Sequence, residues 1–201
     1  MKKGLKTALI VIGILLVLGL LIASPYNNLV RLDEGVKNAW AQVENQLQRR
    51  MDLIPNLVKT VEGYANFERA TLEAVINARA KATSTQINAG DMNPAQLQQY
   101  MEAQNGLTSA LGRLMVVVEK YPELKANENF LRLQDELAGT ENRIAVERKR
   151  YNDQVQTYNQ SVRKFPVVLI AGMLGFGQKP YFEAPAEANA APTVDFSGLN
   201  K

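Results

Sequence analysis

A basic stretch followed by an uninterrupted apolar one predicts a membrane anchor at the start of the chain. Residues 1–6 contain three lysines, and residues 7–23 (TALIVIGILLVLGLLIA) contain no charged side chain. As a helix this run extends about 26 Å, near the lower limit for crossing the hydrocarbon core of a bilayer. A cleaved signal peptide is the alternative, but an Ala-x-Ala site is absent and Pro25 stands where cleavage would occur. We therefore expect one uncleaved transmembrane helix over residues 7–23.

The charges on either side of this apolar segment predict its orientation. Lys2, Lys3 and Lys6 precede it without an acidic residue, whereas Arg31 and Lys37 follow it together with acidic neighbours. Because positive charges are retained on the cytoplasmic side, this bias predicts a cytoplasmic N-terminus. The rest of the chain is then expected outside the bacterial cytoplasmic (inner) membrane, and the protein crosses that membrane once.

Beyond residue 26 the apolar positions recur at intervals of three and four, which predicts long amphipathic helices. One stripe runs through residues 28–82 and a second through residues 97–118, with a polar loop over residues 83–94 between them. The last segment repeats an apolar residue every seven positions, which predicts left-handed bundle packing. These heptad positions are Phe130, Leu137, Ile144, Tyr151, Tyr158 and Phe165. The sequence therefore predicts an all-α fold, an antiparallel bundle of long helices over residues 26–166.

Pro55 lies inside the first stripe and leaves two arrangements open. A proline there deletes one backbone hydrogen bond and its ring clashes with the carbonyl of Met51. One outcome is a kink in a single long helix, which the periodicity favours. The other is a break that returns the chain antiparallel, which burial favours because a single rod would leave part of its stripe uncovered. We expect the break, and with it four helices in up-and-down order.

Two further segments follow the predicted bundle. Residues 167–182 begin with the apolar run VVLIAGMLGF, which is too short to cross a bilayer. It is expected either to cap the open end of the bundle or to contact the membrane surface or a neighbouring subunit. Residues 183–201 are rich in Ala, Pro and Asn with few large apolar side chains, and are expected to be disordered.

The composition excludes several kinds of chemistry. The chain has neither Cys nor His, so thiol nucleophiles, Ser-His-Asp triads and the usual zinc sites are absent. Of 23 basic residues three precede residue 30, which leaves 20 basic against 20 acidic residues in the remainder. Nucleic-acid binding requires a basic face that this balance does not support. We therefore expect no enzymatic activity, no metal, no cofactor and no nucleic-acid partner.

Some polar and aromatic residues are candidates for an interaction site, and each has a structural interpretation beside the functional one. A cluster near Pro55 either recognises an anionic group or, as we favour, forms a solvated face with an Arg-Asp pair. Two charged residues beside the heptad seam either lie at its solvated edge, the favoured interpretation, or form a buried polar pair that fixes helix register. The candidates are Arg49, Arg50 and Asp52 in the first group and Glu141 and Arg148 in the second.

A third candidate pair is the dipeptide Tyr-Asn, which occurs twice, seven residues apart. Tyr151 and Tyr158 are half apolar and require a partner for each hydroxyl. We expect them to pack in the bundle with asparagine partners across it. The alternative is a strip that binds a peptide. Trp40, on the first stripe, is expected in the core.

Three blocks of the sequence resemble the LemA family of bacterial membrane proteins. They are residues 26–65, residues 121–159 with the stretch TENRIAVERKRYN, and residues 165–176 (FPVVLIAGMLGF). The resemblance covers nearly the whole predicted domain and implies an anchored helical bundle without an established activity. It favours a non-catalytic scaffold or interaction protein whose partners are the lipid bilayer, further copies of itself or other membrane proteins. The alternative is an adaptor or regulator of a membrane peptidase in envelope quality control.

Overall fold

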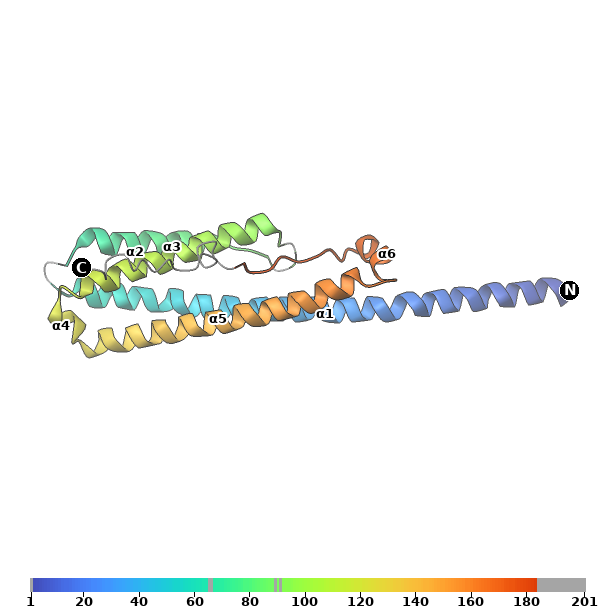
Figure 1. The fold of residues 1–201 in the computed structure, drawn as a ribbon, viewed down its shortest axis with the longest axis horizontal. Coiled ribbons are helices and arrows are strands. Elements are labelled where there is room, and N and C mark those ends of the chain that lie inside the picture. Colours follow the sequence, from blue (N-terminus) through green and yellow to red (C-terminus); the bar gives the residue numbers. More distant parts are fainter. Residues whose placement is uncertain (1, 65–66, 89, 91, 184–201) are drawn as a thin grey trace, which may run out of the picture.

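The computed structural model describes residues 2–64, 67–88, 90 and 92–183, without the side chains of residues 2, 3, 7, 14, 15 and 17–22. Within that part of the chain every regular element is a helix, which confirms the all-α prediction (Figure 1). The elements are α1 (Lys2–Glu62), α2 (Arg69–Ser84), α3 (Pro94–Val118), α4 (Pro122–Lys125), α5 (Glu128–Arg163), α6 (Val168–Ala171) and the 3-10 helix η1 (Gly172–Leu174). Residues 184–201 of the predicted disordered tail lie outside the described residues.

Four long helices, α1, α2, α3 and α5, run alternately in opposite directions, and the N-terminal half of α1 projects beyond the other three (Figure 1). The polar loop predicted over residues 83–94 joins α2 to α3. Asn93 caps α3 by accepting a hydrogen bond from the backbone N–H of Gln96, whose side chain accepts from the N–H of Asn93 in return. Asn127 caps α5 by accepting a hydrogen bond from the N–H of Phe130 at 3.1 Å.

The predicted break at Pro55 is wrong, because α1 continues through Pro55 and ends at Glu62. The chain turns back over residues 63–68 instead, and α2 begins at Arg69. Proline at this position leaves the carbonyl of Met51 without its helical partner. The Nε of Arg79, in α2, donates to that carbonyl at 3.0 Å. The helix is continuous at Pro55, and a side chain of a neighbouring helix replaces the lost hydrogen bond.

The interior of the bundle consists of two apolar clusters. The cluster at the turn end of the bundle combines α1, α2, α3, α4 and α5, and includes Ile54, Leu72, Leu114, Leu124 and Phe130. The cluster nearer the projecting part of α1 combines α1, α3 and α5 with the C-terminal segment, and includes Val36, Trp40, Leu97, Tyr151 and Phe182. Trp40 is buried, as predicted.

The heptad of α5 predicts its buried face correctly up to its last member. Phe130, Leu137, Ile144, Tyr151 and Tyr158 are all buried. Phe165 is 80% exposed because α5 ends at Arg163 and Lys164 has an extended backbone, so the next residue no longer lies on the helix face. In the described residues no helix presents an apolar stretch long enough to span a bilayer.

Candidate functional site

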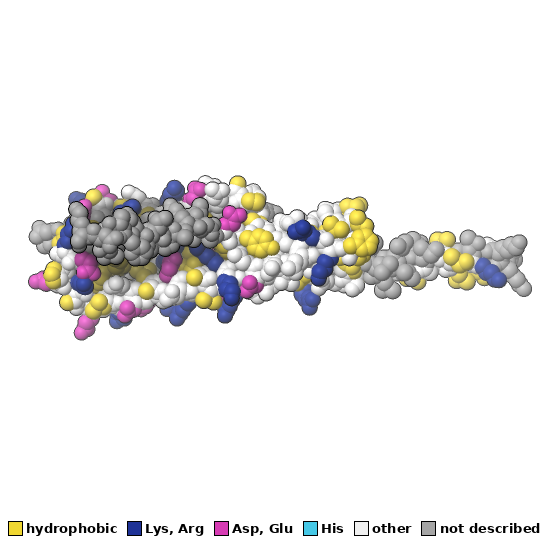
Figure 2. Space-filling model, in the orientation of Figure 1, with side chains coloured by type: hydrophobic (Ala, Val, Ile, Leu, Met, Phe, Trp, Pro, Cys, Tyr) yellow, Lys and Arg dark blue, Asp and Glu magenta, His cyan; other side chains and the backbone are white. Residues whose placement is uncertain are grey.

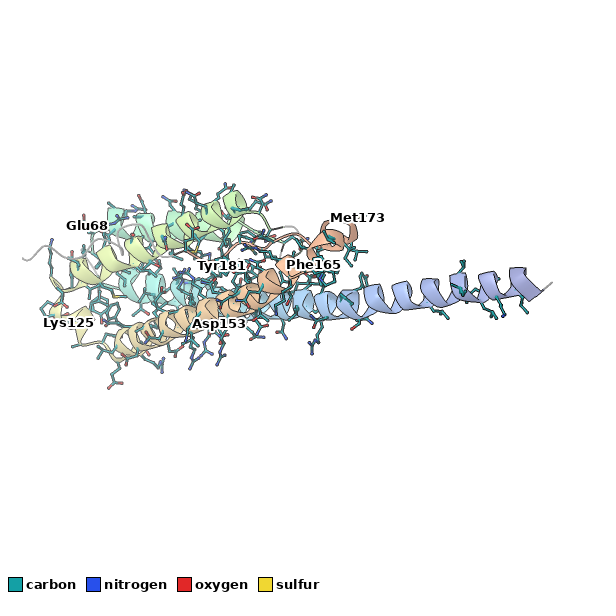
Figure 3. The ribbon with its side chains drawn as sticks, turned by 45° about the vertical axis from the view of Figure 1, so that its right-hand side comes forward. Glu68, Lys125, Asp153, Phe165, Met173 and Tyr181 are labelled. Atoms are coloured by element: carbon teal, nitrogen blue, oxygen red, sulfur yellow. The ribbon has the colours of Figure 1, made fainter. Side chains whose placement is uncertain are left out.

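The C-terminal segment returns along the bundle and lies against α5. After η1 the chain turns at Gly175, whose φ of 83° is left-handed and suits a residue without a Cβ. The following residues run back toward the turn end of the bundle in extended form (Figures 1 and 3). We call residues 177–183 the arm, and the surface of α1 and α5 that it occupies the arm groove.

Two asparagines of α5 hold the arm by its main chain. Asn159 donates from Nδ2 to the carbonyl of Lys179 at 2.8 Å and accepts the N–H of the same residue at 2.8 Å. Asn152 does the same with Phe182, with both distances at 2.9 Å. The hydroxyl of Tyr151 donates to the carbonyl of Pro180 at 3.1 Å. Five hydrogen bonds thus recognise the peptide backbone rather than side chains.

Two side chains of the arm, those of Lys179 and Phe182, contact groups of complementary chemistry on α1 and α5. The Nζ of Lys179 pairs with a carboxylate oxygen of Asp33 at 2.8 Å and lies 5.5 Å from the ring centroid of Tyr158. The Phe182 ring stacks on Trp40, with ring centroids 5.7 Å apart and 15° between their planes. Tyr151 meets the same ring edge to face at 5.1 Å, and the guanidinium of Arg148 lies 5.3 Å from its centroid.

The electrostatics of the groove favour a positive side chain at Asp33. Burial alone would raise the pKa of Asp33, but its hydrogen bonds and ion pairs with Lys179 and Lys37 outweigh burial and hold the pKa below its usual value. The Asp33 carboxylate is therefore charged at neutral pH. Burial raises the pKa of Tyr151 and of Tyr158 to about 12, so both hydroxyls stay protonated and able to donate.

A buried polar layer separates the two apolar clusters and adjoins the end of the arm groove. Its centre is the Arg50 side chain, which is only 2% exposed. The guanidinium donates to Glu141 at 2.7 Å, to Thr108 at 3.1 Å and to the side-chain oxygen of Gln104. Arg50 thereby connects α1 to α3 and α5 at one level of the bundle.

The second arginine of this layer is Arg148. Burial, and next the positive charge of Arg50, lower the pKa of Arg148, which Glu141 partly offsets.

Beside the layer, an open hollow of about 290 Å³ lies between α1, α3 and the end of α2. Tyr100 and Glu44 line it; burial raises the pKa of Tyr100 to about 12 and also raises the pKa of Glu44.

The structure separates the candidates near Pro55. Arg49 and Asp52 are exposed, and Asp52 accepts a hydrogen bond from Gln48. Arg50 points inward to Glu141, so the predicted solvated Arg-Asp face is wrong for this residue. Arg50 lies three residues after Leu47 and four before Ile54, both buried, and residues three and four apart share a helix face.

The structure also contradicts the interpretations that we favoured for the candidate residues on α5. Glu141 is 48% exposed but binds the buried Arg50, and Arg148 is half-buried, so a simple solvated edge is wrong for this pair.

Asn152 and Asn159 bind the arm rather than tyrosines across the bundle, so the predicted tyrosine partners are wrong too. The strip instead holds an extended segment of the same chain. The repeated Tyr-Asn dipeptide was the signal for this groove, whereas Asp33, Gln104 and Lys179 carried none.

Comparison with known proteins identifies relatives over most of the chain. The model of the LemA family matches residues 39–196. Magnetosome protein MamQ 2 of Paramagnetospirillum magneticum is 30% identical over 208 residues, covering 92% of this chain and 75% of that protein. Magnetosome protein MamQ of Magnetospirillum gryphiswaldense is 29% identical, with 80% and 66% covered. Protein LemA of Metamycoplasma hominis is 25% identical, with 79% and 68% covered. The chain belongs to the LemA family.

Proposed function

We propose that this protein is a non-catalytic interaction protein of the bacterial envelope, tethered to the cytoplasmic membrane by the N-terminal part of α1. In this arrangement residues 7–23 cross the bilayer once, the N-terminus is cytoplasmic and the bundle stands outside. The lysines before an uncharged apolar run support this orientation. Pro25 lies within α1, so one helix leads from the proposed anchor into the bundle.

An apolar patch at the end of the bundle from which α1 projects carries the proposal. Phe165, Leu169 and Met173 are 80%, 65% and 88% exposed, and Figure 3 places Phe165 and Met173 at this end. Soluble monomers rarely expose a large contiguous apolar patch without a partner. Figure 2 shows the hydrophobic side chains gathered where the bundle narrows to the projecting helix. A bilayer that contains the start of α1 would reach this patch.

The surroundings of the patch suit a lipid surface. Arg163 and Lys164 are exposed and directly precede Phe165, and Arg31 is exposed on α1 five residues after Tyr26. Basic side chains are attracted to anionic headgroups. The ring of Tyr26 meets that of Phe176 edge to face at 5.7 Å. Aromatic rings favour the interface between headgroups and acyl chains.

The non-catalytic part of the proposal rests on how the polar groups are used. Arg50 and Glu141 bind each other, and Asp33 binds Lys37 and Lys179. The asparagines of the arm groove bind main-chain atoms. The described polar clusters therefore hold helices and the arm in place. Among the described residues, no group of acidic side chains could hold a metal ion.

Fluorescence quenching in vesicles tests the tether and the patch together. Met173→Cys in the full chain, which has no other cysteine, is labelled with an environment-sensitive fluorophore and reconstituted into vesicles containing anionic lipid. We expect quenching by lipids that carry a quencher near the headgroup. Val116→Cys is the matched control, because Val116 is also exposed and apolar but belongs to α3 near the turn end of the bundle.

A third label separates the two parts of the proposal. Ile10→Cys places the fluorophore in the proposed anchor, where deep quenchers should act. Quenching at residue 10 with none at residue 173 would remove the lipid contact of the patch and retain the tether. Equal exposure of all three positions to water would contradict the tether itself.

A further inference from the structure

The open hollow beside the polar layer is enclosed by three separate segments of the chain. α1 contributes Glu44 and Leu47, α3 contributes Tyr100 and Gln104, and the end of α2 with the loop after it contributes residues between 82 and 87. Its volume of about 290 Å³ is close to the lower end of the range found for small-molecule sites. A space with side chains on three sides accepts a small molecule better than it accepts a flat protein surface.

The base of the hollow is apolar and its rim is polar. Leu47, Met51 and Ala82 line it and are buried, whereas Asn45 and Gln86, which also line it, are not. An aliphatic chain that covers such a base is removed from water, which is favourable. The base therefore suits the hydrocarbon part of a ligand.

Two almost fully buried polar side chains reach the hollow with groups that have no partner. Tyr100 is 6% exposed and Gln104 is 2% exposed. The side-chain oxygen of Gln104 accepts from Arg50, but its NH₂ group and the hydroxyl of Tyr100 form no hydrogen bond within the described part of the chain. Neither group is sealed from solvent. Buried polar side chains are normally hydrogen-bonded, so both groups are available to a ligand.

The charge of the hollow selects a cation. Glu44 is the only charged residue among the described residues that line it, and no described cation pairs with this carboxylate. Burial, and next the negative charge of Glu44, raise the pKa of Tyr100, so the carboxylate and the phenol lie close together. An ammonium group has three donors, and both a carboxylate and a phenolic oxygen accept hydrogen bonds. The two side chains thus complement one ammonium group.

We propose that this hollow binds a small aliphatic molecule with a primary ammonium group at one end and a hydrogen-bond acceptor at the other. Glu44 and Tyr100 hold the ammonium group, the NH₂ of Gln104 donates to the acceptor, and the aliphatic chain covers Leu47 and Met51. Tyr100 and Gln104 are one helical turn apart, about 6 Å along α3, which corresponds to a chain of a few carbon atoms. The proposal goes beyond the interaction role and does not rest on the membrane tether.

Titration of the full chain in detergent with aminopentanol tests the site. This straight-chain probe carries its amine and its hydroxyl at opposite ends, and saturation-transfer NMR of the probe measures its binding. The matched pentanediol lacks the charge, and hydroxypentanoate reverses it. We expect saturable binding of aminopentanol, binding of the diol about tenfold weaker or less because the charge-assisted hydrogen bond is lost, and no binding of the carboxylate.

Substitutions assign the binding to the hollow. Glu44→Gln should weaken the binding of aminopentanol by about tenfold or more, since the neutral amide no longer attracts the ammonium group. The control is Glu102→Gln, which removes an exposed carboxylate of α3 that does not line the hollow and should leave the affinity unchanged. Tyr100→Phe keeps the ring and removes only the hydroxyl, so it should weaken binding to a smaller extent.

Protection of a thiol gives a readout that does not depend on NMR. Asn45→Cys places the only cysteine of the chain at the rim of the hollow, and saturating aminopentanol should slow its alkylation by a small maleimide. Leu131→Cys, exposed on α5, should react at the same rate with and without the probe.

Three results would overturn the proposal. The first is absence of saturable binding of aminopentanol up to about 100 mM, since even a weak ligand of this size should bind below that concentration. The second is equal affinity for aminopentanol and the diol, or an affinity unchanged by Glu44→Gln. The third is alkylation of the cysteine at position 45 at one rate with and without aminopentanol.

Discussion

The Nε of Arg79 in α2 donates to the carbonyl oxygen of Met51 in α1 at 3.0 Å, although the two residues are 28 positions apart. This oxygen is the one that Pro55 deprives of its helical donor. The contact gives the freed carbonyl a new donor. It also makes the effects of Arg79 and Pro55 on stability interdependent.

Arg79→Ala should lower the free energy of unfolding by about 1–3 kcal/mol, because the carbonyl of the buried Met51 loses its donor. In a Pro55→Ala background residue 55 again supplies an N–H, so Arg79→Ala should cost much less. A double-mutant cycle by urea unfolding measures the coupling, with the exposed Arg69→Ala as control. Additive effects within about 0.5 kcal/mol would contradict the explanation.

The stability of the protein should fall when the buried Arg50 loses one partner, but not when Arg50 and Gln104 are both replaced by apolar residues. Glu141→Ala leaves the buried Arg50 with less compensation and should cost about 1–3 kcal/mol, below the range for a fully buried pair because Glu141 is half exposed. Arg50→Met combined with Gln104→Leu replaces the centre by apolar groups. It should be as stable as the parent or more so in thermal unfolding. A larger loss in the double variant than in Glu141→Ala would show that the layer stabilises the bundle.

The only tryptophan of the chain reports on the arm. Phe182→Ala removes the ring that stacks on Trp40 and should cost about 3 kcal/mol, the lower end for a buried phenylalanine. Trp40 emission should shift to longer wavelength as water replaces the ring. The adjacent Tyr181→Ala, at an exposed position, should change neither quantity appreciably. Identical emission of the two variants would remove Phe182 from the Trp40 surroundings.

Acid should loosen the arm through Asp33. The pKa of Asp33 is below its ordinary value of 3.8 in the folded protein, so its ion pairs contribute full stability above that value. The contribution is lost as the pH falls from 3.8 through the lower folded pKa. Trp40 emission should therefore change in this window, and Asp33→Asn should show the change already at neutral pH. Titration curves of the same shape in both proteins would contradict the role of Asp33.

Labelling from outside the cell tests the proposed orientation. Leu131→Cys places a thiol at an exposed position of the bundle, and Gly4→Cys places one before the apolar run. In intact spheroplasts an impermeant thiol reagent should label residue 131, whereas residue 4 should react only after lysis. The reverse pattern would place the bundle in the cytoplasm.

Local sequence patterns predict the helices of the bundle correctly. The predictions that the structure overturns were wrong because they depend on contacts between residues distant in the sequence. The heptad of α5 and the stripe over residues 97–118 predict helices that the structure contains. The donor that replaces the lost hydrogen bond at Pro55 is Arg79, which lies on another helix. Periodicity cannot predict such a contact, because it describes which face a residue occupies and not which side chain will meet it.

The site was predictable only in outline for the same reason. The repeat of Tyr151-Asn152 and Tyr158-Asn159 indicated a strip with two possible uses. Its occupant lies in a segment where the sequence predicts only apolar character followed by disorder. The burial of Arg50 follows from its position three residues after Leu47 and four before Ile54 on the apolar stripe, whereas its partners on α3 and α5 do not follow from the sequence.

The continuity of α1 has a mechanical consequence. A helix of 61 residues is about 90 Å long, and its C-terminal half is packed into the bundle while its N-terminal half projects from it. A change of only 10° in the tilt of such a rod displaces one end relative to the other by about 16 Å. Because of this length, a small change in tilt at the projecting end corresponds to a large displacement of the turn between α1 and α2.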